Sequence, residues 1–114
     1  MTPPLLIALI IVLSPSRPDV RVFNVSHYTN ACVPANNGLT ASGMITHAGV
    51  AACGPAFAFG ALVLLEDGRL LICLDRGGAI TDRHLDVWVP LDADGSETTA
   101  IRMGRKQMLG VVIP

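Results

Sequence analysis

Beyond its first nineteen residues, the chain alternates short apolar runs with clusters of turn-forming residues. No window keeps the i, i+3, i+4, i+7 apolar spacing of an amphipathic helix over three turns. The pattern therefore predicts β-strands, and we expect them over residues 20–28, 49–52, 61–65, 70–74, 85–89 and 108–113.

A β-hairpin over residues 62–73 is the strongest local signal. Two apolar runs flank Glu66-Asp67-Gly68-Arg69, and an Asp-Gly pair supplies the positive φ angles that tight hairpin turns need. The second run continues into an acid, Asp75, at the end of its strand.

One short helix is predicted over residues 96–104. Ser96 is a suitable N-cap, Glu97 places an acid in the first turn, and Gly104 ends the segment. A helix of about two turns is stable only when it packs Ile101, Met103 or their neighbours against a sheet. We therefore expect an all-β barrel with one short helix.

The N-terminal segment is the most apolar part of the chain. An unbroken apolar run from Leu5 to Leu13 precedes the first charged residue, Arg17. A transmembrane helix needs roughly 20 residues, whereas the apolar region of a secretory signal needs about 7 to 15. No Lys or Arg precedes the run, so a buried or disordered extension is the alternative. We expect residues 1–19 to be a signal peptide or such an extension, no stable membrane span, and one domain over residues 20–114.

Composition narrows the possible partners and cofactors. A chain of 114 residues has room for a single core. Eight basic against nine acidic residues leave a net charge of −1, with no basic stripe for nucleic acid. Three cysteines without a C-x-x-C pair and three isolated histidines predict no metal and no other cofactor. In an exported protein, the cysteines would form one disulfide, with three pairings possible, and leave one thiol.

Two acids in residues 74–88 are the main candidates for chemistry. Asp75 ends an apolar strand, a two-glycine turn follows, and Asp86 stands eleven residues later between Leu85 and Val87. A buried carboxylate without partners costs several kcal/mol, so Asp86 must face solvent, find donors, or line a cleft. Periodicity alone leaves open that Asp86 lies on the wet face of its strand.

This stretch resembles the signature of the three-aspartate (3D) domain family, found in membrane-bound lytic transglycosylase A and in small cell-wall hydrolases of the stationary-phase survival type. Residues 25–29 resemble the opening strand, residues 39–43 the T-A-[ST]-G loop, residues 55–60 the P-x-G turn, and residues 101–106 the closing helix. The resemblance covers roughly residues 21–113. It implies a six-stranded double-psi β-barrel with one or two short helices, a fold shared with rare lipoprotein A and expansins.

The resemblance also implies an activity. The family cleaves the β-1,4 bond between N-acetylmuramic acid and N-acetylglucosamine, and lytic members form a 1,6-anhydro sugar. A single carboxyl group suffices for this. By position Asp86 would be the general acid and base, and Asp75 would lie nearby and help to hold one proton between the pair. Thr40 would contact sugar, and Gly77 and Gly78 would let the backbone approach the glycan. The implied protein is a secreted or periplasmic monomer whose partner is the peptidoglycan glycan strand.

One of the three family acids is absent. The family's first aspartate falls in a V-D-P-like strand, where this chain reads Ala51-Ala52-Cys53-Gly54-Pro55. The resemblance puts Cys53 near Asp75 in the cleft, and Cys73 stands two residues before Asp75 on the same strand face. It therefore implies a Cys53–Cys73 disulfide. The missing acid makes a catalytically silent, expansin-like module that binds cell-wall glycan the main alternative.

A retroviral-type aspartic protease is a remote alternative. Residues 70–75 followed by Gly77 are similar to its catalytic strand. That family needs D-[ST]-G, and Arg76 stands where the small hydroxyl residue would support the carboxylate pair.

Overall fold

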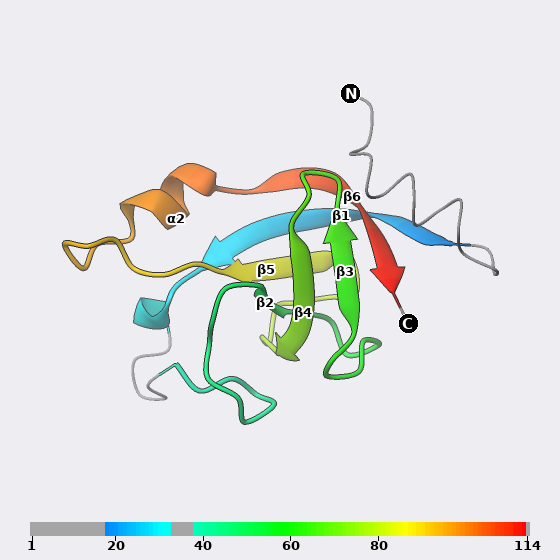
Figure 1. Ribbon diagram of the computed structural model, residues 1–114, viewed down its shortest axis with the longest axis horizontal. Coiled ribbons are helices and arrows are strands. Elements are labelled where there is room, and N and C mark those ends of the chain that lie inside the picture. Colours follow the sequence, from blue (N-terminus) through cyan, green and yellow to red (C-terminus); the bar gives the residue numbers. More distant parts are fainter. Residues whose placement is uncertain (1–17, 33–37, 114) are drawn as a thin grey trace.

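In the computed structural model, which describes residues 18–32 and 38–113, the chain forms a closed barrel of six strands (Figure 1). Its strands are β1 (Asp19–Tyr28), β2 (Val50–Ala52), β3 (Leu62–Leu65), β4 (Leu70–Asp75), β5 (His84–Trp88) and β6 (Lys106–Ile113). A 3-10 turn, η1 (Asn30–Cys32), follows β1, and one α-helix, α2 (Thr98–Met103), precedes β6. The predicted all-β class, the six strands and the short helix are confirmed. The signal peptide or extension predicted for residues 1–19 falls mostly on residues 1–17, which lie outside the described part of the chain, and Asp19 already belongs to β1.

The order of the strands around the barrel is β1-β5-β2-β4-β3-β6. β1 is parallel to β5 and β2 is parallel to β4, whereas the other neighbours are antiparallel. Successive strands β1 and β2 thus enclose β5, and successive strands β2 and β3 enclose β4. Two such ψ-shaped crossings give the double-psi β-barrel expected from the sequence. They also bring β5 and β4, which carry the two candidate aspartates, to either side of the short central strand β2.

Alternation along the strands separates the core from the outer face. In β5, Leu85 and Val87 are buried, while His84, Asp86 and Trp88 are half-buried on the opposite side. The interior is filled by Phe23, Val25, Ala51, Cys53, Phe57, Val63, Leu65, Leu71, Cys73, Leu85, Val87 and Met108.

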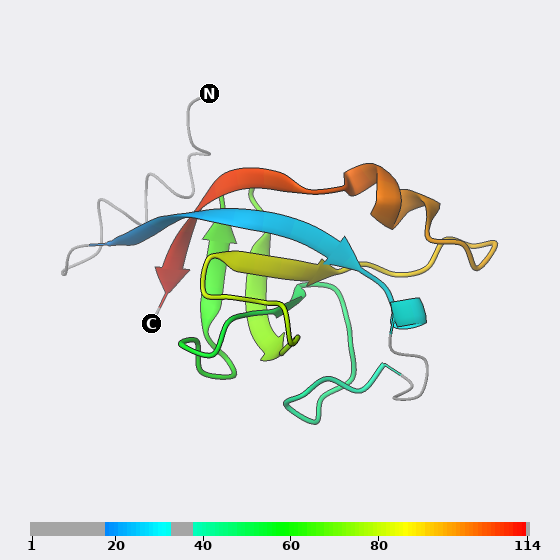
Figure 2. The same ribbon diagram turned by 180° about the vertical axis from the view of Figure 1, so that it is seen from behind.

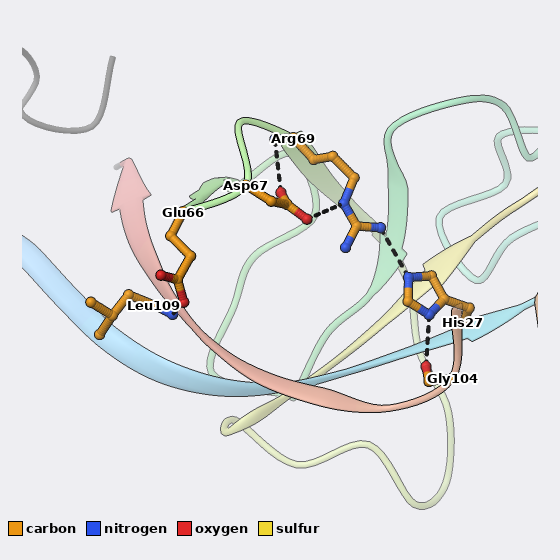
Figure 3. A network of polar contacts seen from close by, with 6 residues as sticks. All are labelled: His27, Glu66, Asp67, Arg69, Gly104 and Leu109. Atoms are coloured by element: carbon orange, nitrogen blue, oxygen red, sulfur yellow. Dashed lines mark hydrogen bonds and ion pairs between the residues drawn. The ribbon is translucent and has the colours of Figure 1, made fainter. Parts of the chain in front are cut away.

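The β3–β4 hairpin has the predicted Asp-Gly turn, with Gly68 at φ 95°. Figure 3 shows the polar contacts that connect this turn to the rest of the barrel. Arg69 pairs with Asp67 at 2.9 Å and donates to Nε2 of His27 at 2.9 Å. Because Arg69 only donates, the hydrogen of His27 is on Nδ1, which donates to the carbonyl of Gly104 at 2.8 Å.

Helix α2 starts later than predicted. Thr98 is its first residue and Glu97 occupies the N-cap without a side-chain cap bond, so the prediction of Ser96 as N-cap is wrong. The reason is that Asp92, in the preceding loop, accepts from the amide of Thr99 at 3.1 Å and takes the place of a local cap.

The face that α2 buries also differs from the expectation. Ala100 is buried, whereas Ile101 is 74% exposed and Met103 is 40% exposed. Of the residues expected to pack, Ile101 and Met103 do not, and their small neighbour Ala100 does. In residues 18–32 and 38–113, no helix has the length and apolar character needed to cross a membrane.

Candidate active site

The two candidate aspartates lie on either side of one residue of β2. Ala52 pairs with Asp75 of β4 on one side and with Asp86 of β5 on the other. β5 in turn pairs Asp86 with Ser26 of β1. Neighbouring strands lie about 4.8 Å apart, so the backbones of Asp75 and Asp86 are separated by two such spacings, about 10 Å.

A β-bulge in β4 aligns this row. Ala51 lies opposite Cys73, whereas Ala52 lies opposite Asp75, so Leu74 is an extra residue in the ladder. Strict alternation would place Asp75 on the same side as Cys73, which is fully buried in the core. The bulge instead leaves Asp75 half-buried at the surface. The expectation that Cys73 and Asp75 share a strand face is therefore wrong.

A surface groove of about 290 Å³ contains both aspartates. After β4, the loop of residues 76–83 doubles back along β5, as Figure 2 shows from behind. The groove is lined by Tyr28, Ala52, Asp75, Arg76, Gly77, Gly78, Ala79, Ile80 and Asp86. The structure thus brings together four of the residues predicted from the sequence, namely Asp75, Asp86, Gly77 and Gly78.

Asp75 is held by three donors. Its Oδ2 accepts from the hydroxyl of Tyr28 at 2.8 Å. Its Oδ1 accepts from the backbone amides of Ala41 and Arg76, each at 2.9 Å. Both carboxylate oxygens therefore act as acceptors in a fixed orientation.

The T-A-S-G loop of residues 40–43 docks on the end of β4. In addition to the Ala41 contact, the amide of Ser42 donates to the carbonyl of Leu74, the bulge residue, at 3.0 Å. Thr40 is 4% exposed, and its hydroxyl donates to the carbonyl of Met44 at 2.6 Å. Thr40 is not among the described residues that line the groove, so its contact with sugar stays a prediction. Its observed partners shape the loop that holds Asp75.

Asp86 is held differently, through one oxygen. The hydroxyl of Ser26 donates to Oδ1 of Asp86 at 2.8 Å. The same Ser26 oxygen lies 2.6 Å from Nε2 of His84. Burial is the main cause that lowers the pKa of His84, with a further lowering by the positive charge of Arg105 and an opposing effect of Asp86.

Arg76 adds a fixed positive charge to the groove. Its guanidinium donates to the carbonyls of Asp75 and Phe57 and lies 4.2 Å from the ring centre of Phe59. These contacts orient the side chain without neutralising it. The groove therefore offers both charged and backbone polar groups to a ligand.

A disulfide joins Cys53 to Cys73, with the two Cα atoms 5.6 Å apart. This is the predicted pairing, and it is confirmed. It lies in the core directly behind the groove, where the amide of Cys53 also donates to the carbonyl of Asp75 at 3.2 Å. Residues 51–55, where the resemblance leads us to expect an aspartate, therefore hold a cross-linked cysteine and no carboxylate.

Sequence reasoning missed three contributors to the site. Tyr28 and Ser26 come from β1, and the Ala41 amide comes from a loop. Their roles depend on the parallel pairing of β1 with β5 and on the docking of a distant loop, which no local pattern specifies. His84 is one of the three histidines to which the sequence assigned no role. No group of three His, Cys, Asp or Glu side chains in the described part of the chain is placed to hold a metal ion.

Comparison with known proteins shows a similarity of fold. The crystal structure of MltA from E. coli matches with a TM-score of 0.51 and 22% sequence identity. The match covers 66% of this chain but only 27% of the MltA chain, so this protein corresponds to about a quarter of it. No protein-family model matches the sequence, and no curated protein does so either.

Proposed function

We propose that this barrel cleaves peptidoglycan glycan strands as a lytic transglycosylase, with Asp86 as the general acid and base. The observation that carries this proposal is the placement of Asp86 in an open groove, with Oδ1 bonded to Ser26 and Oδ2 engaged by no other described residue. A carboxyl group with one anchored and one unengaged oxygen suits proton transfer to a ligand.

Three further observations support the proposal. The motifs in residues 21–113 resemble the family of membrane-bound lytic transglycosylase A, and the barrel is similar in fold to MltA. The disulfide fits a protein that works in an oxidising compartment. We therefore place the protein outside the cytoplasm, in the periplasm or beyond, and expect it to act as a monomer.

The reaction needs no second catalytic carboxylate. Asp86 gives its proton to the glycosidic oxygen while the bond from that oxygen to C1 of N-acetylmuramic acid breaks. The C6 hydroxyl of the same sugar attacks C1, and the Asp86 carboxylate takes the hydroxyl proton. The products are a 1,6-anhydro end and a free N-acetylglucosamine hydroxyl, and Asp86 regains its starting state.

The other groove residues would bind and orient the glycan. Asp75, fixed by three donors, would support the site as a charged acceptor for sugar hydroxyls. Gly77 and Gly78 would allow a sugar ring to approach the backbone, and nothing lies within 4 Å of a Cβ added at Gly78. Thr40 would act at the edge of the site, through its loop.

The test is incubation of the full chain with purified peptidoglycan, followed by mass analysis of released muropeptides. Anhydro-muropeptides are expected from the wild type and not from Asp86→Asn. Asp94→Asn is the matched control because Asp94 is exposed in a loop outside the groove. Equal product from Asp86→Asn and wild type would exclude Asp86 as the catalytic acid.

A silent glycan-binding module is the second candidate, favoured by the lack of a carboxylate in residues 51–55. It predicts binding to insoluble cell wall without any released product. Hydrated muropeptides instead of anhydro products would indicate hydrolysis, and cleavage of a peptide library would favour the protease alternative.

A further inference from the structure

The Ser26 hydroxyl lies between two side chains of the neighbouring strand. His84 and Asp86 are two positions apart in β5 and share its outer side, and Ser26 of β1 is the register partner of Asp86. Its oxygen is 2.6 Å from Nε2 of His84 and 2.8 Å from Oδ1 of Asp86. All three side chains are half-buried, so the contacts are partly shielded from water.

The direction of these two hydrogen bonds follows from counting protons. Oδ1 of Asp86 accepts from the Ser26 hydroxyl, and a serine hydroxyl has a single hydrogen to give. Ser26 gives it to Asp86, so its oxygen must accept from His84, and the His84 ring must carry a hydrogen on Nε2. The result is a directed chain from His84 through Ser26 to Oδ1 of Asp86.

We propose that Ser26 and His84 are positioning residues that keep Oδ1 of Asp86 as an acceptor, so that Oδ2 is the oxygen that carries the transferred proton. A proton on Oδ1 would require Ser26 to turn its hydrogen toward His84 and the ring to move its own hydrogen to Nδ1. As long as His84 donates to Ser26 and Ser26 donates to Oδ1 of Asp86, Asp86 releases and takes back its proton at Oδ2. The lowered pKa of His84 fits this arrangement, because a neutral ring with its hydrogen on Nε2 is sufficient.

This inference rests on the proposed function for its catalytic meaning, but the hydrogen-bond chain can be tested without activity. Nitrogen-15 NMR of the full chain at neutral pH distinguishes the two tautomers of a neutral histidine. We expect His84 with hydrogen on Nε2 in the wild type, and a mixture of tautomers in Ser26→Ala. A wild-type ring with its hydrogen on Nδ1 would overturn the inference.

Turnover of peptidoglycan tests the consequence. Ser26→Ala removes the hydrogen bond to Asp86, and His84→Leu removes the donor that orients the Ser26 hydroxyl, so each is expected to lower kcat about tenfold, with KM little changed. Ser26→Thr keeps the hydroxyl, and His84→Gln keeps an N–H donor without a titrating ring, so both should recover most of the loss. Unchanged kcat in Ser26→Ala and His84→Leu would overturn the positioning role.

Two controls separate the possible failures. Thermal unfolding of each variant identifies loss of fold, in which case Ser26→Thr and His84→Gln carry the comparison. If the wild type releases no muropeptides, the proposed function fails. The tautomer of His84 would still show whether the hydrogen bonds run from His84 through Ser26 to Asp86. If His84→Gln is as impaired as His84→Leu, the titrating ring matters and not its donor, which contradicts the inference.

Discussion

The backbone amide of Ala41 donates to Oδ1 of Asp75 at 2.9 Å, across 34 positions of sequence. Ala41 itself is exposed, so this bond, and not burial, protects its amide. One residue later, the Ser42 amide donates to the Leu74 carbonyl at 3.0 Å. The loop is therefore attached to β4 once through a side chain and once through backbone alone.

Replacing Asp75 should release one of these attachments and not the other. In Asp75→Ala, we expect amide hydrogen exchange at Ala41 to become at least about tenfold faster, because its acceptor is lost. The Ser42 amide serves as the internal control and should exchange much as in the wild type. Equal acceleration at both amides would mean that the whole loop detaches, and no acceleration at Ala41 would contradict the contact.

Two glycines, Gly54 and Gly78, should differ strongly in how far their replacement by alanine destabilises the protein. A Cβ at Gly54 would lie 2.2 Å from Oδ1 of Asp82 and 2.4 Å from its amide nitrogen, whereas a Cβ at Gly78 meets nothing within 4 Å. Gly54→Ala should therefore lower the free energy of unfolding by at least about 2 kcal/mol. Gly78→Ala should change it by less than about 0.5 kcal/mol. Urea titration of both variants measures the difference.

A larger substitution at Gly78 tests whether the glycan binds in the groove. Gly78→Leu should fold, because nothing lies within 4 Å of a Cβ at this position, but its side chain would narrow the groove in which we propose that the glycan lies. We expect a raised KM for peptidoglycan with an unchanged melting temperature. A wild-type KM in a folded Gly78→Leu protein would show that substrate does not pass Gly78.

The disulfide should supply a substantial share of the stability of so small a barrel. It closes a loop with a sequence separation of 20, for which loss of chain entropy predicts about 3 kcal/mol. Cys53→Ser with Cys73→Ser should therefore melt at a much lower temperature, because small domains lose several degrees per kcal/mol. A Cys32→Ser background in all samples prevents thiol exchange. The same melting temperature with and without the cross-link would contradict this.

Local sequence patterns were sufficient to predict the strands. Features that depend on contacts between distant segments could not be predicted from such patterns. Asp67-Gly68 predicted its hairpin because a tight turn depends on a few neighbouring φ angles. The bulge at Leu74 was missed because it is defined by the partner strand, β2, and not by the sequence of β4. Asp92 was missed as the helix cap for a similar reason, since it acts from seven residues away.

The candidate site residues also divide into those that a local pattern predicts and those that only distant contacts bring to the site. The spacing of Asp75 and Asp86 within a recognisable motif was enough to select them. Ser26 and Tyr28 were invisible as site residues, because only the closure of the barrel brings β1 beside the two acids. From the sequence, Ser26 is a polar residue that follows the buried Phe23 and Val25 in an alternating strand. That pattern places Ser26 on the outer face of the strand and assigns it no more specific role.

The lowered pKa of His84 makes a prediction for stability against pH. The folded state binds the His84 proton less tightly than the unfolded state, whose value is near 6.5, so the unfolded state takes up more protons as the pH falls. Stability linked to His84 is therefore fully present above about pH 6.5 and is lost as the pH falls toward the folded value. The charged groups acting on the ring are Arg105, which favours this loss, and Asp86, which opposes it.

His84→Gln is the variant that isolates this effect. Its melting temperature should fall less than that of the wild type between pH 7 and pH 5. The carboxylates with lowered pKa values, Asp19, Asp92 and Asp94, lose their stabilising contribution only at lower pH, because their unfolded value is 3.8. Thermal melts between pH 7 and pH 5, and again at lower pH, separate the contribution of His84 from that of the carboxylates. Parallel curves for the two proteins down to pH 5 would mean that His84 titrates as it does in the unfolded chain.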